Sequence, residues 1–135
     1  MYAKYWNRRW IILKKERALL LVNPMAGQRK AKNNLFAVIE ILSSKYMLTV
    51  HLTESSGDAY RTTRELKDEF KTIFCCGGDG TLNETISGAL HRGVDTPIGY
   101  IPAGSTNDFA STLKIPANVM QAAQVIVDGK PRAHD

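Results

Sequence analysis

Short apolar runs alternate with amphipathic segments along most of this chain. Four apolar runs have the length and composition of buried strands, and they cover residues 18–22, 47–52, 72–76 and 97–101. Apolar positions at helical spacing follow them: residues 30–46, 57–70, 81–90, a short turn from 108, and 118–128. This alternation predicts an α/β fold, with an open, mostly parallel sheet and helices on both of its faces.

Each predicted strand runs into a polar loop that precedes a helix. The loops begin at Asn23, Thr53, Gly77 and Pro102. In an open parallel sheet such loops meet at the carboxyl edge, which is where ligands bind. The four polar loops therefore predict a binding site at that edge.

The loop after the third strand, Gly77-Gly78-Asp79-Gly80, carries the strongest chemical signal. We expect Thr81 to cap the helix that follows. A helix N-terminus leaves backbone N–H groups unpaired, and glycine removes the Cβ atoms that would keep a phosphate away from them. The loop thus predicts a nucleotide-phosphate site with the carboxylate of Asp79 beside it. The alternative, a tight turn that only joins strand to helix, is disfavoured by the three other polar loops.

The composition is typical of a globular chain, with 44% hydrophobic and 23% charged residues among 135. We expect one folded nucleotide-binding domain over residues 18–135 and a cytoplasmic location. No apolar run approaches the ~20 residues of a membrane-spanning helix, and no secretory pattern occurs. Cys75 and Cys76 are adjacent in a predicted strand. This placement favours buried, reduced thiols over a disulfide or a metal site.

Residues 1–17 form a basic, aromatic N-terminal extension that carries the whole net charge of +5. This segment has six Lys or Arg and one Glu, whereas residues 18–135 have twelve basic and twelve acidic residues. Its large apolar residues recur at roughly helical spacing: Tyr2, Tyr5, Trp6, Trp10 and Leu13. Such a segment suits an anionic membrane surface. A solvated extension and a helix packed on the domain are the alternatives. Nucleic acid is not expected, because the charge is unmatched elsewhere.

Two longer motifs point to a known family. The first reads Gly77-Gly78-Asp79-Gly80-Thr81-Leu82-Asn83-Glu84, and the second reads Pro102-Ala103-Gly104-Ser105-Thr106-Asn107-Asp108-Phe109. With Asn23-Pro24…Gly27 and Thr53…Gly57-Asp58-Ala59, they make the chain from about Ala18 onward resemble the diacylglycerol kinase catalytic domain family, which includes sphingosine and ceramide kinases. The resemblance implies transfer of the γ-phosphoryl group of ATP, with Mg²⁺, to a lipid hydroxyl at a membrane surface.

The resemblance also implies the residues of an ATP site in the four polar loops. They are Asn23, Pro24, Met25, Ala26, Gly27, Thr53, Gly77, Gly78, Asp79, Gly80, Thr81, Leu82, Asn83 and Ser105. Asp79 matches the acid of the family's glycine loop, and it would either orient Mg²⁺–ATP or accept the proton of the attacking hydroxyl. Many members carry Thr where this chain has Ser105, so the hydroxyl is kept. The metal ligands stay unassigned.

Members of the family are typically much longer than this chain. They carry a second, β-rich domain, and in the bacterial enzymes an acidic residue of that domain is assigned as the general base. This chain resembles their N-terminal domain alone. We therefore expect residues 1–135 by themselves to show little or no lipid kinase activity.

Two other functions fit part of the pattern. An NAD or sugar kinase would share the glycine loop, but Asn83-Glu84 and the residues from Ser105 to Asp108 favour a lipid kinase. A non-catalytic nucleotide-binding regulatory module would keep the loops without phosphoryl transfer. A dinucleotide oxidoreductase is disfavoured, because Gly78-Asp79-Gly80-Thr81-Leu82-Asn83 lacks the third glycine of that fingerprint and no acidic residue follows at the expected distance.

Overall fold

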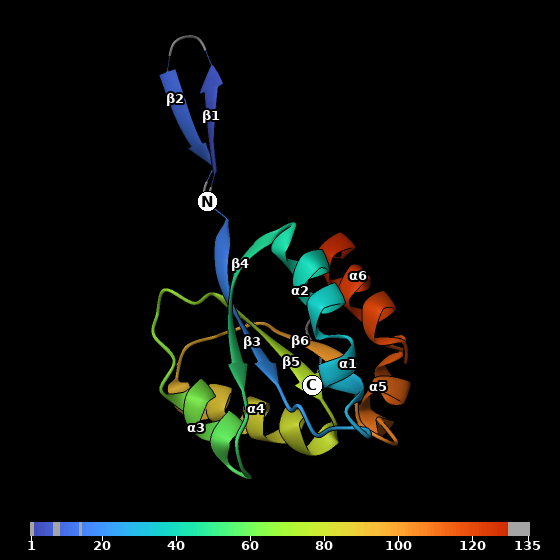
Figure 1. Ribbon diagram of the computed structural model, residues 1–135. Helices are drawn as coiled ribbons and strands as arrows, with labels where there is room; N and C mark the ends of the chain where they lie inside the picture. Colours follow the sequence, from blue (N-terminus) through green and yellow to red (C-terminus); the bar gives the residue numbers. More distant parts are fainter. Residues whose placement is uncertain (1, 7–8, 14, 130–135) are drawn as a thin grey trace.

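A four-stranded parallel sheet forms the centre of the computed structural model, which describes residues 2–6, 9–13 and 15–129 (Figure 1). Its strand order is β4-β3-β5-β6, and every neighbouring pair is parallel. The strands are β3 (Glu16–Val22), β4 (Tyr46–Leu52), β5 (Thr72–Gly77) and β6 (Ile98–Pro102). The two inner strands, β3 and β5, are buried along most of their length, which explains their nearly continuous apolar sequences.

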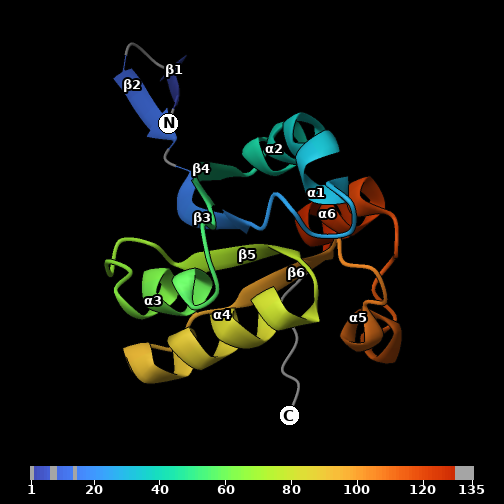
Figure 2. The ribbon, with the colours of Figure 1, turned by 60° about the horizontal axis from the view of Figure 1, so that its bottom comes forward.

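Helices cover both faces of the sheet (Figure 2). Alternate residues of the inner strands point to opposite faces, so that Leu20 and Phe74 belong to the core under α2 and α6, whereas Leu21 and Ile73 pack with Ala59 of α3. The helix α4 covers the rest of this second face. The helices are α1 (Lys30–Asn33), α2 (Leu35–Ser43), α3 (Asp58–Arg64), α4 (Asp79–Arg92), α5 (Asp108–Leu113) and α6 (Val119–Asp128). The predicted fold class is confirmed.

The helix predicted over residues 30–46 is divided at Asn34 and ends earlier, at Ser43. The side-chain Nδ2 of Asn34 donates to the backbone oxygen of Lys30, 2.8 Å away, and so takes an acceptor that a continuous helix would use. Tyr46, expected on the helix, begins β4 instead.

The helix predicted over residues 57–70 ends at Arg64. Beyond it, the guanidinium of Arg92 donates to the backbone oxygens of Leu66 and Lys67 at 3.0 and 2.8 Å. These hydrogen bonds come from the end of α4 and hold the chain as a loop that leads into β5.

The predicted N-cap Thr81 is wrong. The helix α4 begins at Asp79, its N-cap is Gly78, and the backbone N–H of Leu82 donates to the Gly78 oxygen at 3.1 Å. Thr81 lies within the first turn, where its hydroxyl accepts a hydrogen bond from the side chain of Asn23 at 3.3 Å. The strand therefore turns directly into the helix.

The helical spacing predicted for the N-terminal segment is also wrong. Tyr2–Trp6 and Arg9–Leu13 form two antiparallel strands, β1 and β2, in which Tyr2 is paired with Leu13 and Trp6 with Arg9. Tyr, Trp and Ile favour strands, and here this preference outweighs a rough helical periodicity. In Figure 1 this hairpin stands apart from the parallel sheet.

The residues from Pro131 onward, where the sequence also suggests the start of a further strand, fall outside the described residues. Over residues 2–6, 9–13 and 15–129, no helix has both the length and the apolar character needed to cross a bilayer. The division at residues 17 and 18 stays a prediction, although β3 already begins at Glu16.

Candidate functional site

A cavity of about 480 Å³ opens where the four polar loops meet. The strand register explains this convergence, because Val22 lies beside Leu52 and Cys76, and Gly77 lies beside Pro102. The carboxyl ends of all four strands therefore share one edge of the sheet, as predicted. The cavity is lined by Asn23, Met25, Ala26, Thr53, Glu54, Ser55, Ser56, Ala59, Gly78, Gly80, Thr81, Glu84 and Gly104.

The structure brings half of the predicted ATP-site residues to this cavity. Those that line it are Asn23, Met25, Ala26, Thr53, Gly78, Gly80 and Thr81. The other predicted residues lie in the same loops but not on its wall: Pro24, Gly27, Gly77, Asp79, Leu82, Asn83 and Ser105. Leu82 is buried in the core between α4 and the sheet, and Asn83 and Ser105 are exposed.

Three of the four loops contact one another through their backbones. A Cβ atom on Gly27 would lie 2.2 Å from the backbone oxygen of Ala103, and one on Gly104 would lie 2.6 Å from the Cα of Gly78. Gly27 also has a φ of +53°. Because real Cβ atoms cannot approach so closely, the loops can meet here only at glycine. Gly27 and Gly104 therefore allow the loops to touch one another, and Gly104 also lines the cavity.

Gly80 has the opposite surroundings. It is exposed, and a Cβ atom built on it would meet nothing within 4 Å. It lies in the first turn of α4, where backbone N–H groups have no partner within the helix. Gly78 and Thr81, on either side of it, also line the cavity. This end of α4 is therefore suited to an anion, since unpaired N–H groups and the helix dipole both favour negative charge there.

Asp79 connects the glycine loop of α4 to β6 and α5. Its Oδ1 accepts a hydrogen bond from the Tyr100 hydroxyl at 3.1 Å, and its Oδ2 accepts one from the backbone N–H of Asp108 at 2.8 Å. Burial removes water from the Tyr100 hydroxyl, and together with the hydrogen bond to Asp79 it raises the pKa of Tyr100 well above its usual 10. Tyr100 is therefore a protonated donor at neutral pH.

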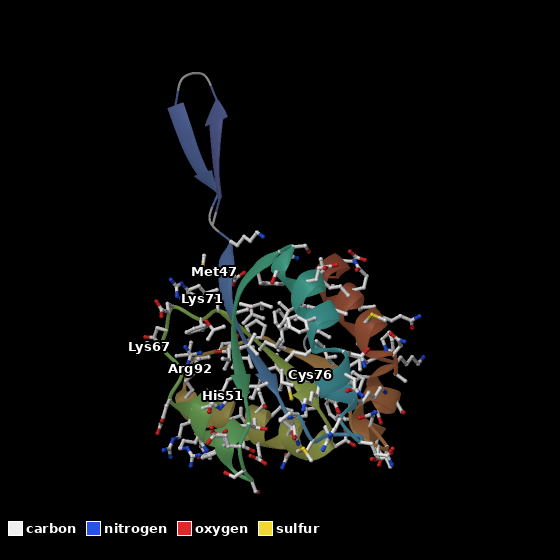
Figure 3. The ribbon with its side chains drawn as sticks, in the orientation of Figure 1. Met47, His51, Lys67, Lys71, Cys76 and Arg92 are labelled. Carbon is white, nitrogen blue, oxygen red and sulfur yellow. The ribbon has the colours of Figure 1, made fainter. Side chains whose placement is uncertain are left out.

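The fourth loop, which runs from Thr53 to Gly57, is held by carboxylates. Asp58 accepts from the backbone N–H of Glu54 at 2.9 Å, and Glu84 of α4 accepts from the backbone N–H of Gly57 at 2.8 Å. The ring of His51, labelled near the carboxyl end of β4 in Figure 3, lies 3.0 Å from Asp58. The loop is thus fixed at both ends by side chains of α3 and α4.

These hydrogen bonds change the acidity of Asp58. The Glu54 backbone N–H and then the His51 ring stabilise its ionised form, and they outweigh the opposing effect of burial. The pKa of Asp58 falls from 3.8 to about 2. Asp58 is therefore ionised in the folded protein at neutral pH.

Several cavity residues were missed as site residues by reasoning from the sequence. They are Glu54, Ser55, Ser56, Ala59, Glu84 and Gly104. All of them lie in or beside the loops and motifs that the sequence singled out, so position was the signal that could have found them. Their side-chain contacts with neighbouring loops, such as that between Glu84 and Gly57, depend on the packing of α3 against α4.

Comparisons with known proteins agree with one another. Residues 17–135 match the sequence profile of the family described as the diacylglycerol kinase catalytic domain. Proteins named diacylglycerol kinase from Staphylococcus epidermidis and Staphylococcus aureus are 36% and 34% identical to this chain over 117 residues, which are 85% of this chain and 37% of each relative. This chain therefore spans well under half the length of those relatives.

Solved structures show the same likeness. One structure of a putative diacylglycerol kinase from Bacillus anthracis str. Sterne superimposes with a TM-score of 0.78 at 34% identity, covering 86% of this chain and 42% of that one. Another, with a TM-score of 0.79 and 33% identity, covers 88% and 41%. Both confirm the α/β architecture with its parallel sheet.

We predict that Asp58→Asn destabilises the protein in a pH-dependent way. Because the folded pKa of Asp58 is depressed, its stabilisation is present above pH 3.8 and is lost as the pH falls through about 2. The difference between the unfolded and folded pKa of Asp58 corresponds to about 2 kcal/mol in the free energy of unfolding at neutral pH. Urea unfolding of both proteins between pH 2 and pH 7 measures it. Asp95→Asn, at an exposed position, is the control. A penalty that does not shrink toward pH 2 would contradict this assignment.

Proposed function

The chain belongs to the diacylglycerol kinase catalytic domain family, and we propose that it is the ATP-binding part of a kinase that phosphorylates a lipid hydroxyl such as that of diacylglycerol. One observation carries the proposal: a cavity of about 480 Å³ at the carboxyl edge of the sheet, with the N-terminal turn of α4 in its wall. This volume lies within the range of cofactor sites, ~300–1,000 Å³.

The phosphates of ATP would bind at the start of α4. Gly78, Gly80 and Thr81 are the parts of that turn on the cavity wall, and Gly80 leaves open space above the backbone. Backbone N–H groups at a helix N-terminus bind phosphate oxygens without any cationic side chain. The Thr53–Ser56 loop also lines the cavity and would supply hydroxyl groups for the remainder of the nucleotide.

The residues present fit a Mg²⁺ ion that arrives with the nucleotide. Among the described residues, no group of three or more His, Cys, Asp or Glu side chains could hold a metal by itself. Mg²⁺ usually binds one or two carboxylates together with substrate phosphates and keeps several waters. Asp79 accepts one hydrogen bond at each oxygen and retains further lone pairs, so it would be such a ligand. The bound ion would neutralise charge on the transferring phosphoryl group.

In the reaction, the residues of this chain would position the nucleotide. The helix N-terminus would hold the phosphates, and Asp79 would orient the metal-bound nucleotide. We assign Asp79 this positioning role, because two neighbouring elements hold its carboxylate in one orientation. The longer relatives have further sequence that residues 1–135 do not include. The lipid-binding site and the general base would lie in that part of the protein. The enzyme would meet its lipid at a membrane surface.

We predict that Gly80→Leu weakens binding of Mg²⁺–ATP to residues 1–135 at least tenfold. The added side chain would extend into space that the phosphates need, and its Cβ atom would meet nothing in the fold within 4 Å. Gly78 is less suitable, because its Cβ would lie 3.3 Å from Gly104. Isothermal titration calorimetry measures the affinity. Gln124→Leu, exposed on α6 and away from the cavity, is the matched control. Equal affinity of Gly80→Leu and the unaltered chain would remove the phosphate assignment.

We also predict that the full-length protein phosphorylates diacylglycerol with ATP, and that Asp79→Asn lowers kcat by ~10²-fold or more, as loss of a group that stabilises transition-state charge does elsewhere. Transfer of radiolabelled phosphate to diacylglycerol and to NAD measures both activities. Residues 1–135 alone should transfer little or none. Preference for NAD would identify an NAD kinase. If the protein is instead a non-catalytic nucleotide-binding module, neither transfer should be detected and Asp79→Asn should leave every kinase activity unchanged.

A further inference from the structure

We propose that Tyr100 is a positioning residue that holds the Asp79 carboxylate in the orientation needed for the metal-bound nucleotide; this inference rests on the proposed function. Among the described residues, Tyr100 is the side chain that donates a hydrogen bond to Asp79. The other donor is the backbone N–H of Asp108. The carboxylate of α4 is thus held from two other elements, β6 and the start of α5.

Tyr100 itself has little freedom. It lies within β6, opposite Cys75 of β5, and only 6% of its surface is exposed. Its ring contacts that of Phe109, with centroids 6.3 Å apart and an interplanar angle of 60°, and it packs in one cluster with Leu82 of α4. The sheet and these contacts therefore direct the hydroxyl toward Asp79.

The second donor is fixed as well. The loop before Asp108 is closed by the side chain of Asn107, which accepts from the backbone N–H of Gly104 and donates to the Gly104 oxygen, both at 2.9 Å. Gly104 in turn lies against Gly78. Asp79 is therefore hydrogen-bonded to a loop closed by Asn107 on one side and to a buried phenol on the other. Each carboxylate oxygen has one donor, and its remaining lone pairs are free for a ligand.

This arrangement explains what a tyrosine contributes at position 100. A phenylalanine would keep the ring, the burial and the contact with Phe109, but would leave Oδ1 of Asp79 without its donor. An Asp side chain rotates about two bonds, so Asp79 would adopt more conformations without this donor. Binding of the metal-bound nucleotide would then restrict these conformations, at a cost in entropy. Tyr100→Phe should therefore affect binding only when the metal is present.

The test measures ATP binding to residues 1–135 by calorimetry, once with Mg²⁺ and once with EDTA. We expect Tyr100→Phe to weaken Mg²⁺–ATP binding about five- to tenfold, within the range for a hydrogen bond to a charged group. Metal-free ATP binding should change less than twofold. In the Asp79→Asn background, Tyr100→Phe should have no further effect, because the group that it positions is no longer a carboxylate.

Tyr60→Phe is the matched control, since it removes a hydroxyl that lies 2.7 Å from the ring of His91, outside the cavity. Circular dichroism checks that each variant is folded. The inference is overturned if Tyr100→Phe has no effect, if it weakens ATP binding equally with and without Mg²⁺, or if its effect adds fully to that of Asp79→Asn. If the unaltered chain binds no ATP in either buffer, the proposed function fails, and the inference fails with it.

Discussion

Close contact between the backbones of three loops determines the shape of the site. Gly27 meets Ala103, and Gly104 meets Gly78, at separations that leave no room for a Cβ atom on Gly27 or Gly104. Backbone hydrogen bonds join the same loops, since the N–H of Ala103 donates to the Gly77 oxygen at 2.8 Å. These contacts place the first turn of α4 at the edge of the cavity and keep its N–H groups accessible. Side chains at Gly27 and Gly104 would hold the loops after β3, β5 and β6 farther apart.

The fourth loop is held in place by side chains rather than by backbone contact. Between Thr53 and Gly57 the chain is held by Asp58 and Glu84, whose carboxylates accept backbone N–H groups. One wall of the cavity is therefore set by backbone contact, and the other by hydrogen bonds to the carboxyl groups of Asp58 and Glu84. The backbone wall depends on the absence of side chains and is insensitive to pH, whereas the other wall depends on Asp58 remaining ionised. Asp79 is held in the same manner, by Tyr100 and Asp108, at the junction of α4 with β6 and α5.

Much of this could be predicted from the sequence, because it depends on local pattern. Apolar runs followed by polar loops were enough to predict the parallel sheet and the convergence of the loops at the edge where the cavity lies. The distinct roles of Gly27 and Gly80 could not be predicted, because they depend on what lies opposite each residue in the folded chain. The same holds for the contact of Tyr100 with Asp79, which are 21 positions apart. At Thr81 a local capping rule was wrong, because Gly78 already supplied the turn into the helix.

The central claim is that the N-terminal turn of α4, backed by the Gly104 loop, binds the phosphates of ATP. The most direct measurement is an amide NMR titration of residues 1–135 with Mg²⁺–ATP. Our account predicts that the largest shift changes fall on Gly78, Gly80, Thr81 and Gly104, with smaller ones in the loop from Thr53. Changes confined to the surface of α2 and α6, or none at saturating nucleotide, would contradict it.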